Sequence, residues 1–346
     1  MEKHYVGLDV STKKTSVCVL SEDGEVVLET DVATDPLEIY AAVKPWRRSL
    51  AKVGHETGSL SPWLHKELQR AGLPIVCLEA LHTRASLAAQ RNKTDRNDAL
   101  GIAQLLRSGW CKTVHVKSDE AHRMRLLLAH RRALKRKAVD IENALRQTLK
   151  AFGIRLHAAG RGQFREAIEE AAGDDPLLMG LTDAMLRARD ALLAEFNAMH
   201  KLVERLAVHD PVCRRFMTVP GVGPVTAVAF KASVDDPTRF RRSRTLGAHF
   251  GLTPQRYQSG AIDIQGSISK RGDGEVRVLL FEAARSMMIR SKLNSALKSW
   301  GLRLAKKRGM KRAAIAVARK LAAILHRMWL DGSEFRFTRQ AELPST

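Results

Sequence analysis

The stretch HYVGLDVSTKKTSVCVLSEDGEVVLET, residues 4–30, decides the first half of the fold. It holds short apolar runs at residues 4–8, 15–20 and 26–30, with the turn SEDGE before the last of them. Such runs with turn residues between them predict strands, and the short connections favour an antiparallel meander. The chain therefore begins with three neighbouring strands, and Asp9 ends the first.

After these strands the sequence alternates between helical and extended patterns. Apolar spacing and proline positions predict a helix from residue 36 to about 50, a strand at 52–56, a helix at 62–70, a strand at 74–78 and a helix at 95–107. Three strands followed by this alternation is the element order of the ribonuclease H fold, although other α/β domains share parts of it. We expect an α/β domain over residues 1–115.

The middle of the chain, residues 116–208, reads as helical. Apolar residues fall near heptad spacing between residues 118 and 150, around the basic run RRALKRK at 131–137. Glycines and a proline interrupt the pattern, which resumes from 181 to 208. A helical hairpin or coiled coil fits, so we expect a spacer that serves self-association, with nucleic-acid contact along its basic face as an added role.

The last part, residues 209–346, is expected to be mainly helical. In TVPGVGPVTAVAF, Gly221 and Gly223 separate two helical runs. They predict either a turn whose amides approach a phosphate or a plain tight turn. A second feature is an alanine-rich helix expected from 303 to 328, which has nine Lys or Arg and no acid. A helix of one sign is typical of a surface that faces a polyanion.

Composition limits the partners. The 346 residues include 58 Lys plus Arg against 37 Asp plus Glu, for a net charge of +21 and a pI of about 10.3, which points to nucleic acid. Aromatic residues make up only 5%, so phosphate contacts should carry most of the affinity.

No run is long enough to span a bilayer or act as a signal peptide, so we expect no membrane partner and a cytoplasmic protein. The four cysteines lack metal-binding spacing and are expected to be reduced and buried.

Four acids stand out against this basic background. Asp9 and Glu56 end strands, and Asp95 and Asp98 lie three residues apart on the expected helix. Such a pair repels itself unless a cation lies between the carboxylates, and a divalent metal ion with oxygen ligands suits this position. Alternatively, Lys93 and Arg96 neutralise the pair as surface ion pairs. Together the four acids occupy the positions where ribonuclease H-type nucleases hold two metal ions.

The sequence resembles the DEDD transposases of bacterial insertion sequences, the insertion-sequence one-ten family, which are regarded as RNA-guided recombinases. The stretches that carry the resemblance are YVGLDVS (5–11), GHETG (54–58), KTDRNDA (93–99), VPGVGPVTA (219–227), GLTPQRYQSG (251–260), SISKRGDGEVR (267–277) and AVARKLA (316–322). It implies a RuvC-like N-terminal domain whose tetrad is Asp9, Glu56, Asp95 and Asp98, a helical spacer, and a C-terminal transposase domain with a nucleophilic serine. That serine maps to Ser259, with Ser267 and Ser269 as rivals. The family often has SSGG where this chain has QSGA.

The resemblance also implies a reaction and its partners. A serine would attack a phosphodiester held by Mg2+, or by Mn2+ as a substitute, and form a phosphoserine link before strands exchange. Expected partners are donor and target double-stranded DNA, a noncoding bridge RNA and further copies of the chain in a dimer or tetramer, at the bacterial nucleoid. The residues expected to contact nucleic acid are Lys93, Arg96, Arg131, Arg132, Lys135, Gly221, Gly223, Arg256, Lys270, Arg271, Arg277, Lys306, Lys307, Arg308, Lys311 and Arg312.

One inference rests on spacing alone. A helical arm of about a hundred residues, at about 1.5 Å per helical residue, could carry Ser259 far from its own tetrad, so we expect a composite site with the serine from another protomer. Two alternatives stay open. A hydrolytic Holliday-junction resolvase would use the tetrad with water, and a non-enzymatic packaging protein would need only the charge.

Overall fold

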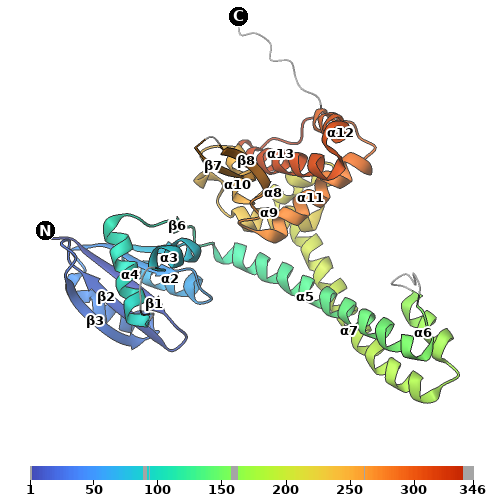
Figure 1. The fold of residues 1–346 in the computed structure, drawn as a ribbon, viewed down its shortest axis with the longest axis horizontal. Helices are drawn as coiled ribbons and strands as arrows, with labels where there is room; N and C mark the ends of the chain where they lie inside the picture. Colours follow the sequence, from blue (N-terminus) through green and yellow to red (C-terminus); the bar gives the residue numbers. More distant parts are fainter. Residues whose placement is uncertain (1, 89–91, 93, 157–162, 261, 338–346) are drawn as a thin grey trace, which may run out of the picture. The chain divides into compact units, whose positions relative to one another are not determined.

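The computed structural model describes residues 2–88, 92, 94–156, 163–260 and 262–337. The chain divides into two compact units, residues 1–117 and 118–346 (Figure 1). The helices expected as a separate spacer belong to the second unit. The division into three domains at residues 115 and 208 therefore stays a prediction.

The first unit is built on a six-stranded sheet in the order β3-β2-β1-β4-β5-β6. Its strands are β1 (His4–Val10), β2 (Lys14–Leu20), β3 (Val26–Ala33), β4 (Leu50–Glu56), β5 (Ile75–Leu78) and β6 (Thr113–Val114). The first three form the expected antiparallel meander, while β1, β4 and β5 are mutually parallel neighbours. Mixed strand directions in this order agree with a ribonuclease H-like domain.

Helices cover both faces of this sheet. Apolar residues of α1 (Pro36–Val43) and α2 (Ser61–Arg70) pack with alternate residues of β1, β2 and β4 on one face. On the other face α4 (Asp95–Ser108) packs against β1 and β2, and α3 (Ala80–Leu87) lies beside it (Figure 1). The helix expected up to residue 50 is shorter, because α1 gives way to the 3-10 helix η1 (Lys44–Trp46), and β4 already starts at Leu50.

The second unit begins with a long helical arm. Helix α5 (Asp119–Thr148) continues into the 3-10 helix η2 (Leu149–Phe152) and pairs with α7 (Pro176–His209), while α6 (Phe164–Ala172) closes the far end (Figure 1). The arm is thus a helical hairpin within one chain, one of the two expected forms. Glu142 and Arg189 form a buried ion pair across it, with 2.8 Å between Arg189 Nε and Glu142 Oε1.

The body of the second unit surrounds an aliphatic and phenylalanine core. Its helices are α8 (Pro211–Met217), α9 (Pro224–Val234), η4 (Pro237–Arg239), η5 (Ser243–Thr245), α10 (Leu246–His249), α11 (Gly274–Ile289), α12 (Ala296–Arg308) and α13 (Met310–Asp331). The expected continuous helix from 303 to 328 is wrong in one respect. It breaks at Gly309, whose φ of 80° no L residue adopts readily, so its basic residues are shared between α12 and α13.

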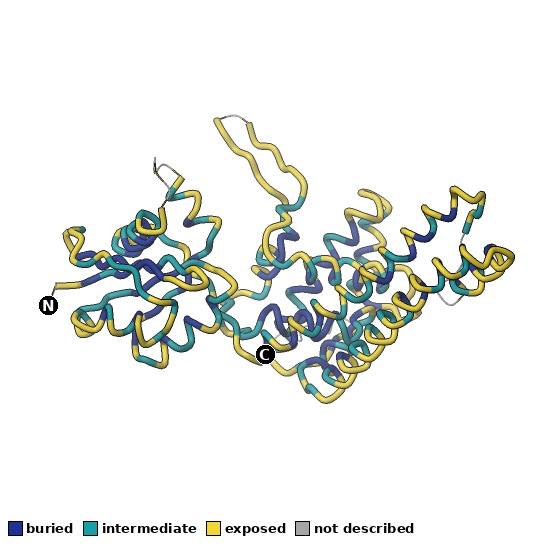
Figure 2. Tube along the Cα trace, turned by 90° about the horizontal axis from the view of Figure 1, so that it is seen from below, coloured by how far each residue is buried: buried dark blue, intermediate teal, exposed yellow. Residues whose placement is uncertain are grey.

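An exposed β-hairpin completes the second unit. Strands β7 (Pro254–Ser259) and β8 (Ile262–Ile268) pair with each other as a separate two-stranded sheet, and nearly every described residue in them is exposed (Figure 2). The four cysteines are free, as expected, and three of them are buried, whereas Cys111 is only partly buried. Among the helices that the structure describes, none is long and apolar enough to cross a membrane.

Candidate active site

Asp9 and Glu56 lie side by side at one edge of the sheet. Strands β1 and β4 are parallel with Leu8 opposite His55, so the next residue of each strand lies at the same level. Side chains alternate along a strand, and Leu8 packs on the α1–α2 face, which turns Asp9 toward the α4 face. His55, the residue before Glu56, contacts His65 of α2 on the other face of the sheet. By the same alternation, Glu56 faces α4. Burial lowers the pKa of His55 to about 4, so its ring is neutral at pH 7.

Asp95 and Asp98 occupy the first turn of α4, as the sequence predicted. Thr94 caps this helix by accepting from Asn97 N, and acids in a first turn interact favourably with the helix dipole. The first turn lies at the end of β1 that bears Asp9. Asp95 is 3.9 Å from Lys14 of β2 at that edge, whereas Tyr5 at the other end of β1 packs near the later part of α4.

The depth of α4 is set by Gly7. A Cβ on Gly7 would lie 1.9 Å from Ala99 O and 2.6 Å from Ala103 N, so only glycine allows the helix to rest on β1 here. Asp9 is two residues beyond Gly7 on the same face, and Asp98 directly precedes Ala99. Two strand ends and one helix end therefore bring all four acids to the same edge and face of the sheet.

The cations beside this edge bind other acids as well. Lys14 Nζ is 3.2 Å from Asp31, and Arg96 reaches Asp31 at 3.5 Å and Glu29 at 3.7 Å. Hydrogen bonds from Ser16 and Lys14 lower the pKa of Asp31. Arg96 thus forms ion pairs with two acids of β3. Lys93 lies outside the described residues.

The four carboxylates suit a divalent metal ion in kind, because Mg2+ prefers hard oxygen ligands. Their present side-chain positions do not enclose one. Across the part of the chain that the structure describes, no group of three or more His, Cys, Asp or Glu side chains is arranged to hold a metal ion. Asp9, Glu56 and Asp98 are partly buried and Asp95 is exposed.

Ser259 lies in the other unit, at the tip of the β7–β8 hairpin. It pairs with Ile262, the first residue of β8, and it is exposed. The rivals lie at the base of the hairpin. Ser267 is near the end of β8, and Ser269 N donates to Thr253 O at 2.9 Å just beyond the strand. The three serines are therefore distinct in position, and Ser259 alone of them stands at the tip.

Comparison with known proteins decides the family. The model "Transposase IS116/IS110/IS902 family" matches residues 213–300, and a DEDD-type IS110 transposase model matches residues 6–154. The "Transposase for insertion sequence element IS1111A" of Coxiella burnetii is 30% identical over 92% of this chain and 88% of its own length. The chain belongs to the IS110 family of DEDD transposases. It is therefore a DNA-recombining enzyme.

Other relatives extend over similar lengths. A "Probable family 20 transposase" of Pseudomonas aeruginosa is 27% identical to this transposase over 84% of the chain and 81% of its own length. A "Pilin gene-inverting protein" of Moraxella bovis is 22% identical over 94% of the chain and 95% of its own length. The two family models cover the acids in the first unit and the helices that flank the hairpin in the second.

Several expected nucleic-acid residues make contacts inside the transposase. Arg131 lies 4.6 Å and Lys135 5.8 Å from the ring centre of Phe196 on α7, and Arg132 is 2.5 Å from Glu275. Arg277 donates to the backbone carbonyls of Phe250 and of Arg271 in the KRGD turn. Arg256 donates from Nε and Nη2 to the two carboxylate oxygens of Asp263, at 2.7 Å each. These side chains support the fold as described.

The glycines and the remaining cations differ among themselves. Gly221 packs directly on α11, because a Cβ there would lie 2.3 Å from Ala283 O, whereas a Cβ on Gly223 would meet nothing within 4 Å. The exposed cations fall in two groups. One lies at the base of the hairpin and the other around the Gly309 break, and together they comprise Lys270, Arg271, Lys306, Lys307, Arg308, Lys311 and Arg312.

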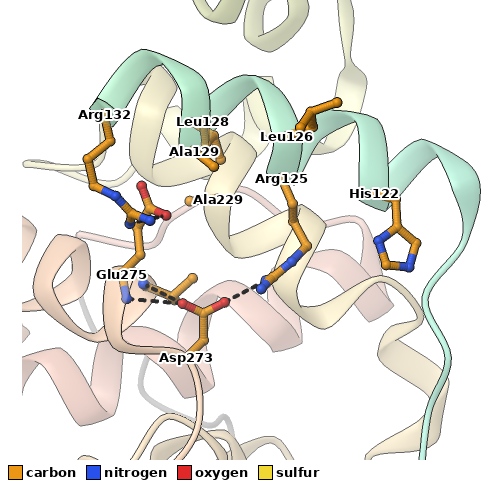
Figure 3. Close-up of a pocket in the computed structure, with 10 residues that line it drawn as sticks. His122, Arg125, Leu126, Leu128, Ala129, Arg132, Ala229, Asp273 and Glu275 are labelled. Atoms are coloured by element: carbon orange, nitrogen blue, oxygen red, sulfur yellow. Dashed lines mark hydrogen bonds and ion pairs between the residues drawn. The ribbon is translucent and has the colours of Figure 1, made fainter. Parts of the chain in front are cut away.

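Asp273 of the KRGD turn is an important residue that the sequence did not single out. It caps α11 by accepting from Glu275 N and Val276 N, and it binds Arg125 of α5 at 2.6 Å (Figure 3). These residues border a pocket of about 300 Å³ between α5, α9 and α11. Burial alone would raise the pKa of Asp273, but the bonds from Arg125 and the helix amides hold it below its usual value. The turn is thereby fixed beneath the hairpin.

Proposed function

We propose that this transposase cuts and exchanges DNA strands with the tetrad Asp9, Glu56, Asp95 and Asp98 and with Ser259 as nucleophile. The proposal is supported by the positions of the acids at the ends of the paired strands β1 and β4 and in the first turn of α4, and by family membership. A packaging protein would have no need for this arrangement. A bacterial chromosome as substrate would place the protein at the nucleoid.

The serine chemistry conserves the energy of the phosphodiester. The Ser259 hydroxyl attacks phosphorus, a new Oγ–P bond forms, and the bond from phosphorus to the leaving deoxyribose oxygen breaks. The serine proton is lost to solvent or a base, and the departing oxygen gains a proton. A hydroxyl end of a second strand then attacks the phosphoserine and releases the serine. No ATP is consumed, which agrees with the lack of a GxxxxGK[ST] sequence.

The tetrad would hold Mg2+, or Mn2+ in its place. Such an ion, when bound, polarises the phosphate oxygens and stabilises the attacking and leaving oxygens. Phosphate oxygens of the bound DNA would supply further ligands to such an ion. The choice of donor and target we assign to a noncoding bridge RNA, which leaves the protein to bind backbone and shape.

The tetrad and Ser259 lie in different units. We propose that, in a dimer or tetramer, the tetrad of one protomer works with the serine of another. The test mixes two inactive variants, one with Asp98→Asn and one with Ser259→Ala. A composite site predicts that some activity returns in the mixture, because one protomer supplies a working tetrad and its partner a working serine. No rescue at any ratio would contradict it.

The function itself is tested in bacteria that carry the gene with its flanking DNA, with new DNA junctions as the readout. We expect Asp95→Asn or Asp98→Asn to abolish junctions while binding to DNA changes little. A hydrolytic resolvase predicts instead that Ser259→Ala still cuts DNA. Normal junction formation by either aspartate variant would contradict the assignment of these residues to the tetrad.

A further inference from the structure

The β7–β8 hairpin has two chemically different faces. Tyr257 lies opposite Ile264, and Ser259 lies opposite Ile262. Because side chains alternate along a strand, these two pairs share one face. The neighbouring pair Gln258 and Asp263 points the other way, and Arg256 holds Asp263 there. Ser259 thus stands on an uncharged, largely apolar face.

This apolar face is open to solvent. Tyr257 is 65%, Ile262 50% and Ile264 58% exposed. An isolated two-stranded sheet is at best marginally stable in water, so a face of this composition is expected to be covered in the working state. Tyr257 also differs from the other two tyrosines, Tyr5 and Tyr40, which are both partly buried.

We propose that this face stacks against unpaired DNA bases next to the phosphate that Ser259 attacks. Tyr257 would stack on one base, and Ile262 and Ile264 would fill the space left by bases that have separated. The inference rests on the proposed function of Ser259 and deepens it. It makes Tyr257 a positioning residue that brings a strand-separated site to the hydroxyl.

The spacing of the residues supports this role. Tyr257 and Ser259 are two residues apart on one strand, or about 7 Å. Successive bases along a strand lie about 3.4 Å apart. A phosphate at Ser259 therefore brings bases one or two steps away over Tyr257. Base stacking on an aromatic ring works with every base, which suits an enzyme whose target sequence is chosen elsewhere.

Charge favours nucleic acid over a protein partner on this face. The nearby carboxylate of Asp263 lies on the opposite face and is bound by Arg256. Lys270 and Arg271 are exposed at the base of the hairpin, where the backbone of a bound strand would continue. A wedge of apolar side chains flanked by cations is the arrangement that proteins use against separated base steps.

The test compares two labelled DNA probes with the full-length protein, by fluorescence anisotropy. One is a duplex with a central bubble of unpaired thymines, and the other is the same duplex fully paired. We expect Tyr257→Ala to weaken binding to the bubble about ten-fold and to leave duplex binding within about two-fold. Tyr257→Phe should bind the bubble normally, because it keeps the ring. Gln258→Ala, a neighbour on the opposite face, is the matched control.

The same experiment separates this inference from the proposed function. Ser259→Ala should bind the bubble like the unaltered protein, because the hydroxyl is not needed for stacking. If Ser259→Ala still recombined DNA, the nucleophile would be wrong while the Tyr257 effect on binding remained. Equal loss of bubble and duplex binding in Tyr257→Ala would overturn the inference. A change in the oligomeric state of Tyr257→Ala, measured by sedimentation without DNA, would also overturn the inference, because it would show that a second copy of the chain covers this face.

Discussion

Gly7 is the residue on which the position of the α4 acids most depends. Its missing Cβ lets Ala99 O approach β1, and Gly7→Ala would force the helix away from Asp9. We expect this variant to lower the free energy of unfolding by about 1–3 kcal/mol, as overpacking does. Gly58→Ala is the control, since its nearest neighbour, Ser61 Oγ, would be 3.6 Å away. Urea unfolding measures both, and equal stability of the two variants would contradict the argument.

Asp273 gives a second prediction at the scale of one residue, in the pH dependence of stability. Its pKa is lowered in the folded state, so the carboxylate stabilises the fold above its unfolded pKa of about 3.9, and this stabilisation is lost as pH falls through the lower folded value. Asp273→Asn should cost about 2 kcal/mol at pH 7, from the lost ion pair with Arg125 and the weakened helix cap. Its stability should then fall less steeply below pH 4. If the acid denaturation curves of Asp273→Asn and of the unaltered protein ran parallel, the prediction would be contradicted.

At the scale of elements, the sequence predicts regular segments well and their breaks poorly. The first five strands and α4 follow from apolar spacing and turn residues. The use of the four acids as one metal-binding tetrad stays a prediction. The break at Gly309 did not follow, because one interior glycine costs a helix only about 1 kcal/mol and is often tolerated. The sequence pattern does not predict the hairpin either. The apolar side chains of the hairpin face solvent, so its local sequence pattern does not indicate what they pack against.

The arm presents an exposed apolar stripe that should govern self-association. Leu177, Leu181 and Met185 recur every fourth residue on α7 and are 74%, 63% and 38% exposed. Leu181→Glu should therefore shift the protein toward monomer in sedimentation velocity without unfolding the arm. Val208→Glu, an exposed site near the other end of α7, is the control. An unchanged oligomer in Leu181→Glu would exclude this stripe as the interface.

At the scale of the whole molecule, the charge of +21 is concentrated in part around one helix break. Lys306, Lys307, Arg308, Lys311 and Arg312 are exposed on both sides of Gly309. Replacing all five by Gln should reduce the slope of log affinity for duplex DNA against log salt by about 0.9 for each phosphate that is no longer neutralised. Arg327→Gln serves as the control, because Arg327 lies farther along α13 beside Asp331. An unchanged slope in the five-fold variant would show that DNA does not bind at the cations around Gly309.

The chemistry of the whole molecule depends on a covalent link between protein and DNA. The most direct measurement isolates the protein–DNA adduct formed with Mg2+ on DNA that carries the gene and its flanks, and maps the linked peptide by mass spectrometry. We predict a phosphoserine at Ser259, and no adduct with Asp98→Asn. Attachment at Ser267 or Ser269, or cut DNA with no covalent protein, would contradict the account.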